Sequence, residues 1–552
     1  MSNVREYIVS VKDFNDLDSL YNDIENIGTG IFSALPSRAV ECCARRPISK
    51  NTHYMLTDDE ASIVRNDPRV YAVTLNMVDS GLTVVRKSLE HSNNWTKNFN
   101  ITSQSKNWGL LRVTNGQTIS GWGTNGTTEA SGNVSLNSGG LYVDVVICDG
   151  HFIPDHPEFA VNADGTGGSR KNEYNWFLQN PTVTGGAVGN YVYTPYTDPN
   201  NQNAIDDNNH GCHVAGIACG NSQGWARNAT IYNISPYDTN PNPNAATYVF
   251  DYIRAWHQTK PINPKTGRQN PTIVNCSWGI GSTIPINSIS SITYRGTTIN
   301  GPFTGSTINS YGLFSDDNLN VTAPARFSPT EVDIQSAIDD GIIIVSAAGN
   351  SYEGIFLSTQ QDYNNYLTSN GSNYLYNQGD TPGAADNVIC VGSAGSLVIE
   401  KKADYSCCGT RINIWAPGDY ITSAWNNTYT NGGGQSPVID PRNSSYNIQI
   451  DSGTSMASPQ VTGVLACALE TYPGLTATTI LSYIKSVSTT NQLTDSGTPF
   501  PDLYWLQGAP NRYLYYVQER LNSGNVYPKS NMHNRPASGA VWPRPRIFRY
   551  GS

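Results

Sequence analysis

The chain has 552 residues, which is enough for two to four domains of ordinary size. Hydrophobic residues make up 38% of it and charged residues 14%, so a large core can form. The formal net charge of −10 argues against nucleic acid as a partner, because contacts to phosphates need basic residues. No apolar run approaches the roughly 20 residues of a membrane-spanning helix, so we expect no membrane partner either.

The N-terminal part of the chain, residues 1–80, has the pattern of a small α+β domain. Residues 7–13 (YIVSVKD) predict a strand, residues 16–27 an amphipathic helix and residues 69–76 (RVYAVTLN) another strand. A second helix is predicted to begin near Thr57, because a glutamate follows three residues later, as in a capping box. The order of these elements fits a ferredoxin-like domain, with one or two middle strands that the pattern does not locate.

A different pattern begins after a polar linker, which we assign to residues 81–106. Near-continuous apolar runs, typical of strands buried on both faces, recur at residues 141–149, 229–235, 271–278, 341–349 and 387–394. Helical patterns occur at residues 211–219, 244–259, 330–340, 454–471 and 475–487. This alternation predicts an α/β domain in three layers, with a parallel sheet flanked by helices.

Two polar segments depart from the alternation. Residues 281–328 form a Gly- and Ser-rich stretch that is too long for an ordinary loop, so we expect an insertion with structure of its own. Residues 522–552 are rich in proline and have little periodicity. This C-terminal tail is expected to be extended, and ordered only where it docks on a partner.

Four motifs carry the residues of a nucleophilic mechanism. VVICDG ends a predicted strand with Asp149, and NNHGCHVAGI opens a predicted helix with His210. IIIVSAAGNS ends another strand with Asn350, and DSGTSMASPQVTGV opens a helix with Ser455. Open α/β sheets place their active sites at the carboxyl ends of the strands, so we expect these four side chains to meet.

The residue types suit acyl transfer. A serine hydroxyl is a weak nucleophile near neutral pH, so Ser455 needs a base, and His210 can take its proton and return it to a leaving amine. Asp149 would hold the imidazole tautomer and stabilise the imidazolium. The backbone N–H of Ser455 and the side-chain amide of Asn350 could bind the oxyanion.

These motifs, in the order Asp, His, Ser, resemble those of the subtilisin-like serine proteases, the subtilase family. HGCHVAGI resembles the family's histidine motif, GTSMASPQVTG its serine motif, AAGN its oxyanion motif and NCSWG its substrate-binding strand. GWARNATIY and WAPGDYITS match further landmarks, so the resemblance runs from about Asn107 to about Asn522. It implies a subtilisin-like catalytic domain over residues 107–521, which cleaves polypeptides as a serine endopeptidase through an acyl-enzyme.

The resemblance also implies the roles of individual residues. Asp149, His210 and Ser455 would be catalytic, and Asn350 and Ser455 would form the oxyanion hole. A peptide substrate would add as a strand beside the NCSWG segment. The implied substrate-binding residues are Ser277, Trp278, Gly279, Ala347, Ala348, Gly349, Gly453 and Thr454.

The first 80 residues resemble the family's inhibitory propeptide, which assists folding and then occupies the cleft. The chain would then be a self-processing zymogen whose partner in cis is its own N-terminal domain, with a maturation cut between residues 77 and 106. The implied chemistry requires no cofactor. Calcium is the family's usual structural ion, and Glu158, with the loop around Asn221 as a partner, is the candidate ligand.

The sequence departs from the family pattern at several positions. Gly150 follows Asp149 where serine or threonine is usual, and Cys212 replaces a threonine in the histidine motif. Trp278 stands where a smaller residue is common, so the cleft could be reshaped. A metal site around Cys212 and His213 is the alternative, but the second ligand pair that zinc sites have is missing. His213 is therefore expected to be structural.

A rival hypothesis is a structural or assembly protein on a subtilase scaffold, for example one associated with a virion. Its motivation is the insertion, the C-terminal tail as a docking segment and an N-terminus without the apolar core of a secretory signal. Several of the ten cysteines lie in apolar runs, and the two vicinal pairs are poorly placed to bridge. These features favour a reducing, cytoplasmic or viral-particle location over classical secretion.

Overall fold

The computed structural model describes residues 4–25, 35, 40–46, 48–86, 88–89, 107–116, 134, 136–180, 183, 209–237, 245–396, 399–425, 437–497 and 503–517. The predicted C-terminal tail, residues 522–552, lies outside the described residues. So does most of the predicted linker.

The N-terminal domain is an antiparallel sheet with two helices. Its elements are β1 (Arg5–Val11), α1 (Leu17–Glu25), β2 (Cys42–Arg45), β3 (Asn51–Leu56), α2 (Asp58–Arg65) and β4 (Val70–Leu75). The sheet order is β2-β3-β1-β4, and both neighbours of β1 run antiparallel to it. The α+β prediction is confirmed, and the two strands that the sequence did not locate are β2 and β3. The capping box at Thr57 and Glu60 is also formed, with both reciprocal hydrogen bonds.

The larger domain is built on an eight-stranded, mostly parallel sheet in the described part of the chain. Its order is β22-β23-β18-β17-β14-β9-β7-β8. The bounds are β7 (Asp144–Cys148), β8 (Thr230–Ile234), β9 (Thr272–Cys276), β14 (Ile343–Ala347), β17 (Ile389–Ala394), β18 (Ile414–Pro417), β22 (Thr489–Thr490) and β23 (Arg512–Tyr513). Each of the five apolar runs contains one of these strands. The central strands β7, β9 and β14 are buried throughout, as apolar runs covered on both faces must be.

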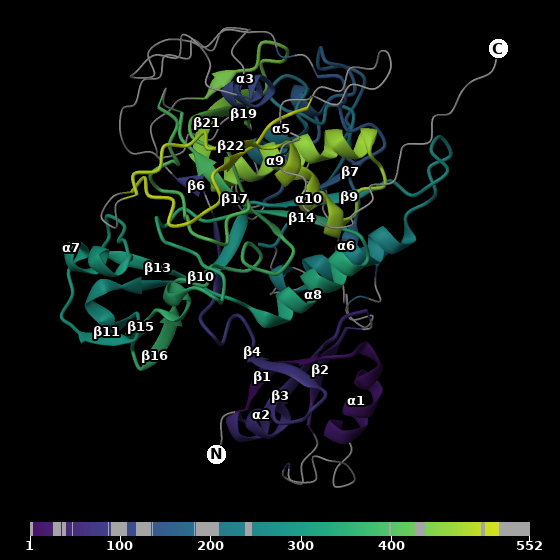
Figure 1. The fold of residues 1–552 in the computed structure, drawn as a ribbon. Helices are drawn as coiled ribbons and strands as arrows, with labels where there is room; N and C mark the ends of the chain where they lie inside the picture. Colours follow the sequence, from purple (N-terminus) through teal and green to yellow (C-terminus); the bar gives the residue numbers. More distant parts are fainter. Residues whose placement is uncertain are drawn as a thin grey trace, which may run out of the picture. The chain divides into compact units, whose positions relative to one another are not determined.

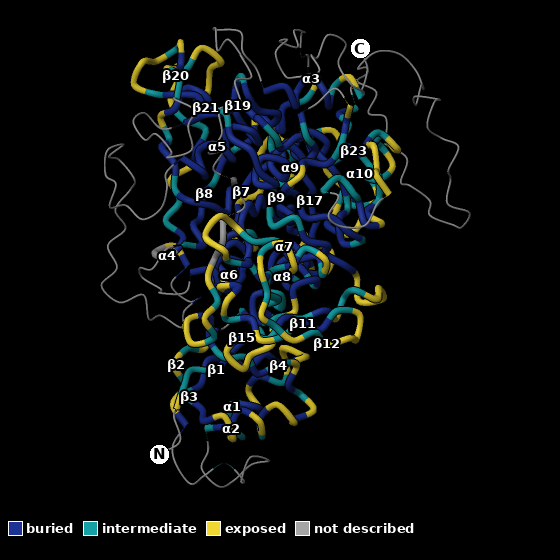
Figure 2. The backbone as a smooth tube through the Cα atoms, turned by 90° about the vertical axis from the view of Figure 1, so that its left-hand side faces the viewer, coloured by how far each residue is buried: buried dark blue, intermediate teal, exposed yellow. Residues whose placement is uncertain are grey.

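Helices cover both faces of this sheet (Figure 1). On one face α9 (Thr454–Thr471) lies over the central strands and packs against α5 (His210–Cys219). On the other, α6 (Ala245–Thr259) packs against α8 (Ser328–Asp339), which also contacts α10 (Ala477–Val487). The predicted three-layer α/β architecture is confirmed. Figure 2 shows the buried residues concentrated along the central sheet and its helices.

The predicted insertion is structured. Its strands are β10 (Trp278–Pro285), β11 (Ile289–Tyr294), β12 (Thr297–Asn300) and β13 (Asn320–Pro324). The hairpin of β15 (Tyr366–Ser369) and β16 (Ser372–Leu375) completes a four-stranded sheet in the order β12-β11-β15-β16. Ile284, Ile292 and Leu367 belong to one separate hydrophobic cluster here. The subdomain therefore draws on a second chain segment that the sequence pattern did not connect to the first.

The chain just after the N-terminal domain forms two short strands against the larger domain. β5 (Thr83–Arg86) pairs antiparallel with β10, so that Arg86 lies opposite Trp278. β6 (Ser88–Leu89) pairs antiparallel with β21 (Asn447–Gly453), so that Ser88 lies opposite Gly453. These residues belong to the predicted linker.

A buried cation joins the N-terminal domain to α6 and α8. The guanidinium of Arg46 donates to Asp251 at 2.8 Å and forms an ion pair with Asp333, and all three side chains have no exposed surface. Ser49 Oγ also donates to Asp333, at 2.6 Å, and Asn51 Nδ2 donates to the carbonyl of Pro329 at 2.9 Å. Burial raises the pKa of Asp251, as does the nearby charge of Asp333, while Arg46 opposes the rise.

All ten cysteines lie in the described part of the chain and are free thiols, so the vicinal pairs Cys42-Cys43 and Cys407-Cys408 form no disulfide. Among the described residues, no helix combines the length and the apolar character that a membrane span requires.

Candidate active site

Asp149 and His210 meet at the carboxyl ends of the parallel strands. Asp149 directly follows β7, and His210 is the first residue of α5. His210 Nδ1 lies 2.7 Å from Asp149 Oδ1, which also accepts the backbone N–H of Gly150 at 2.8 Å. The side chains are 4% and 0% exposed, so the pair is shielded from water. A Cβ on Gly211 would lie 2.0 Å from the carbonyl oxygen of Gly150, so only glycine lets α5 start this close.

Ser455 is the second residue of α9, where helix N–H groups are unpaired. Its Oγ donates to the carbonyl oxygen of Ser277 at 3.0 Å, and His210 Nε2 has no hydrogen-bond partner among the described residues. The hydroxyl is therefore turned away from the imidazole in this structure. Rotation about χ1 moves Oγ between staggered positions, and such bonds often tighten only when substrate binds.

Asn350 is fixed by the residue before Ser455. Its Oδ1 accepts from both the backbone N–H and the hydroxyl of Thr454, each at 2.9 Å. The hydroxyl of Thr454 also accepts the N–H of Gly349 at 3.1 Å. Gly349 has a φ of 113°, which favours glycine. The amide oxygen is thus directed at Thr454, which leaves the NH₂ end of the amide pointing away from that residue.

The residues expected to bind substrate come from the same segments as the groups described above. The side chains of two of them, Ser277 and Trp278, pack inside the domain. Ser277 Oγ donates to the backbone carbonyl of Ser455 at 2.9 Å, so this side chain holds α9. Trp278 is fully buried, with Phe250 of α6 as its ring neighbour at 6.4 Å. Any contact that this segment makes with a peptide would therefore have to come from the backbone edge of β10, to which Gly279 also belongs. Ala347 and Ala348 are buried at the end of β14, and Gly453 and Thr454 lead into α9.

The metal alternative finds no support at the histidine motif. Burial lowers the pKa of His213 to about 3, and its Nε2 lies 3.1 Å from the carbonyl of Gln449, so it is a neutral structural residue. Burial raises the pKa of the Cys212 thiol, which therefore stays protonated. No group of three or more His, Cys, Asp or Glu side chains that could hold a metal lies within the described ranges.

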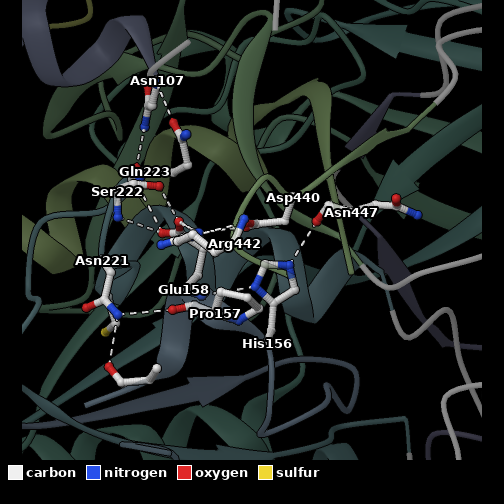
Figure 3. Close-up of polar contacts among 12 residues, drawn as sticks. Asn107, His156, Pro157, Glu158, Asn221, Ser222, Gln223, Asp440, Arg442 and Asn447 are labelled. Atoms are coloured by element: carbon white, nitrogen blue, oxygen red, sulfur yellow. Dashed lines mark hydrogen bonds and ion pairs between the residues drawn. The ribbon is translucent and has the colours of Figure 1, made fainter. Parts of the chain in front are cut away.

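The carboxylate of Glu158 is surrounded by protein donors (Figure 3). Its Oε2 accepts the backbone N–H groups of Ser222 and Gln223, at 2.9 and 3.0 Å. Its Oε1 accepts from the hydroxyl of Ser222 and from the guanidinium of Arg442, which also binds Asp440 at 2.6 Å. Burial would raise the pKa of Glu158, but the charge of Arg442 and the donors of Ser222 and Gln223 outweigh it and hold it below its ordinary value.

The expected partner of Glu158 in a calcium site is also engaged as a donor. Asn221 Nδ2 donates to the backbone carbonyl of Pro157 at 3.0 Å (Figure 3). It also donates to the backbone carbonyls of Ala160 and Asn162, at 2.9 and 3.2 Å. Calcium needs six to eight oxygen ligands, and a guanidinium at the carboxylate excludes a second cation there. The residues present therefore do not fit calcium at Glu158. Sequence reasoning missed Arg442 because no motif surrounds it.

Replacing Arg442 by leucine should destabilise the protein by about 3 kcal/mol, because Glu158 and Asp440 would be left buried without a cation. Arg295→Leu, which breaks an exposed ion pair with Asp362, should cost less than about 1 kcal/mol. Urea unfolding of each purified protein measures both effects. Since the folded pKa of Glu158 is lowered, its contribution persists above the ordinary pKa of about 4.3 and is lost as pH falls further.

A chelator distinguishes the two cations. EDTA should leave the unfolding midpoint unchanged at this site, since arginine supplies the charge. A fall in the midpoint with EDTA that matches the Arg442→Leu effect, and is reversed by calcium, would show that the ion is bound here after all.

Comparison with known proteins addresses the fold and the motifs together. Residues 140–502, about two thirds of the chain, match the family model described as the subtilase family. The chain belongs to the subtilase family. The matched residues include all four motifs.

Two relatives illustrate the distance within the subtilase family. The alkaline proteinase of Hapsidospora chrysogena is 26% identical over 58% of this chain and 55% of its own length. The extracellular serine proteinase of Thermus sp. strain Rt41A is 23% identical over 54% of this chain and 50% of its own. The chain thus spans about half the length of the curated relatives it matches. Nothing in these matches supports the expected cytoplasmic or viral-particle location.

Solved subtilase structures are similar at low identity. Fervidolysin from Fervidobacterium pennivorans, a keratinolytic enzyme, is 15% identical, with a TM-score of 0.47 over 92% of this chain and 60% of its own. A cold-adapted subtilisin-like serine proteinase is 19% identical, with a TM-score of 0.42 over 75% of this chain and 98% of its own.

Proposed function

We propose that the protein is a serine endopeptidase in which Asp149, His210 and Ser455 form the catalytic triad. The contact of 2.7 Å between His210 Nδ1 and Asp149 Oδ1, beside Ser455 at the start of α9, is the observation that carries this proposal. The substrate class is polypeptide, and these side chains supply the chemistry without a cofactor.

The geometry assigns a task to each group. His210 Nε2 takes the proton of Ser455 as Oγ attacks the scissile carbonyl, and later gives it to the leaving amine. Asp149 keeps Nδ1 protonated and stabilises the imidazolium. The N–H of Ser455 and the amide of Asn350 bind the oxyanion, and the α9 N-terminus adds a favourable field. Water activated by His210 then hydrolyses the acyl-enzyme.

The N-terminal domain is proposed to be an inhibitory and folding-assisting propeptide, so that the full chain is a zymogen that processes itself. Two observations support this. The domain has the α+β fold expected of such a propeptide, and the strand β5 that follows it lies along the edge of β10 where a peptide substrate would bind.

A fluorophosphonate probe tests the proposal, because it reacts with an activated serine. We expect one adduct, located on Ser455 by peptide mass spectrometry and absent from His210→Ala. Labelling that persists in His210→Ala, or an adduct on another serine, would contradict the proposed triad. Because β5 pairs with β10, the proposed substrate-binding edge, the labelling is measured on the full chain before and after incubation that allows processing.

Replacing Asn350 by leucine should lower kcat by about 10²–10³-fold with little change in KM, because one oxyanion donor is lost and the ground state does not use it. Peptide hydrolysis at saturating and limiting substrate separates the two constants. Asn300→Leu, at an exposed position of β12, is the control and should leave both unchanged. A rise in KM alone would mean that Asn350 only helps to bind substrate.

The rival proposal, an assembly protein on a subtilase scaffold, gains no specific observation. The C-terminal tail that motivated a docking partner lies outside the described residues, and the insertion folds as a subdomain with its own core.

A further inference from the structure

The segment after the N-terminal domain is held on both sides of Ser455. On one side Arg86 is opposite Trp278, the neighbour of Ser277, whose carbonyl accepts the hydroxyl of Ser455. On the other side Ser88 is opposite Gly453, two residues before Ser455. In the chain, the two peptide bonds from Arg86 to Ser88 therefore come between the two strand pairings that flank the nucleophile. The sequence there reads Arg-Lys-Ser, so both peptide bonds in this interval follow a basic residue.

An acidic pair lies beside the same elements. Glu353 comes three residues after Asn350, and Ser351 Oγ donates to its Oε2 at 3.2 Å. Asp380 precedes Thr381, whose carbonyl accepts the N–H of Ile280 in β10 at 3.0 Å. One carboxyl thus belongs to the oxyanion loop and the other to the loop that flanks the substrate-binding edge of β10. The two interact electrostatically.

Among the described residues, no ion pair joins Glu353 to a cation. Its side chain is fully buried, and Oε1 has no hydrogen-bond partner among the described residues. Burial raises its pKa well above the ordinary value, the hydrogen bond from Ser351 opposes this, and the charge of Asp380 adds to it. An unpaired buried carboxyl is costly, and a lysine or arginine side chain is the group that would compensate it.

Combining the backbone register with this acidic pair, we infer that the active site cleaves polypeptides after a basic residue, that Glu353 and Asp380 determine this specificity, and that the chain's own cut lies between Arg86 and Ser88. The inference rests on the proposed function. Ser455 Oγ would attack the carbonyl carbon of Arg86 or Lys87, and the C–N bond to the next residue would break. His210 would pass the serine proton to the new amine, and water would then release the N-terminal fragment as a carboxylate.

Intact mass and N-terminal sequencing of the incubated full chain test the cut. The C-terminal fragment should begin at Lys87 or Ser88. The double variant Arg86→Gln, Lys87→Gln should lose this fragment, whereas Lys97→Gln with Lys106→Gln, the same charge change further along the linker, should keep it. A fragment that begins elsewhere, or one unaffected by Arg86→Gln with Lys87→Gln, overturns the assigned cut.

Peptides test the specificity independently of processing. For the processed protein, kcat/KM should be at least about 100-fold higher for TVVRKSLE, residues 83–90, than for the same peptide with Gln-Leu in place of Arg-Lys. Glu353→Gln and Asp380→Asn should each reduce this ratio about 10- to 100-fold, because a charge partner is lost. Asp386→Asn, an exposed acid on the same loop as Asp380, should keep the ratio. Because the readout is a ratio within one protein, partial unfolding of a variant does not imitate the result.

The outcomes separate the two proposals. Fluorophosphonate labelling of Ser455 with equal cleavage of both peptides, or preference for Gln-Leu, overturns the specificity and leaves the endopeptidase standing. Neither labelling nor cleavage of either peptide overturns both.

Discussion

Replacing Ser455 by alanine is expected to lower kcat for peptide hydrolysis by roughly 10⁶-fold and to abolish self-cleavage. This is the loss measured for the serine of subtilisin, where the triad acts as a unit. His210→Ala should cost about as much, because without the base the hydroxyl is a weak nucleophile. The double variant should be no worse than either single variant, since each removes the same pathway.

Stopped assays measure these rates on purified protein. Because the inactive variants cannot process themselves, each is first cleaved in trans by the active protein and then repurified. His213→Gln is the matched control, because His213 is three residues along the same helix and its Nε2 lies 3.1 Å from the backbone carbonyl of Gln449. It should keep kcat within about 10-fold if it folds, while its stability falls. Additive losses in the Ser455 and His210 double variant would show that the two residues do not share one step.

Replacing Arg46 by methionine is expected to weaken docking of the N-terminal domain by about 3–5 kcal/mol. The substitution keeps an unbranched apolar side chain but leaves Asp251 and Asp333 buried without their cation. Hydrogen exchange of the N-terminal domain, in a Ser455→Ala background that prevents cleavage, reports the free energy of opening. Protection should fall about 10²–10⁴-fold in β1 to β4 and little in β14.

Arg45→Met is the control for this experiment. Arg45 precedes Arg46 in the chain, but its side chain is 48% exposed and pairs with Glu25 within the N-terminal domain, so its loss should cost less than about 1 kcal/mol. The Arg46→Met effect should also depend on pH. Because the folded pKa of Asp251 is already raised and rises further without arginine, the loss is greatest near pH 8 and smaller near pH 5. Equal losses for the two arginine variants would contradict the buried ion cluster.

The expected substrate strand beside β10 is occupied in the structure by residues of the chain itself. Three contacts hold these residues. The N-terminal domain docks through Arg46, and β5, which follows that domain in the chain, pairs with β10. The next strand, β6, pairs with β21 near Ser455. Under the proposed function these contacts describe an inhibited precursor. The strength of docking of the N-terminal domain and the position of the cut can then be changed separately. Arg46→Met weakens the docking, whereas Arg86→Gln with Lys87→Gln removes the cut.

The sequence by itself determined the α/β class and the five core strands, and it predicted that Asp149, His210, Asn350 and Ser455 lie together. Each of these lies in a contiguous motif or a short periodic run, and local patterns report burial and element type directly. It also indicated the α+β character of the N-terminal domain, although β2 and β3 escaped it because neither is a long apolar run with strict alternation.

Only the tertiary structure decided which distant groups meet. Arg442 reaches Glu158 across 284 residues, and that contact replaced the expected calcium with a guanidinium. Arg46 reaches Asp333 across 287 residues, and β15 joins the insertion from outside its predicted bounds. Periodicity and spacing describe neighbours along the chain, whereas an ion pair or a strand pairing depends on how the sheets and helices pack. For the same reason, the acidic pair of Glu353 and Asp380 became a candidate specificity site only when β10 and the oxyanion loop were seen together.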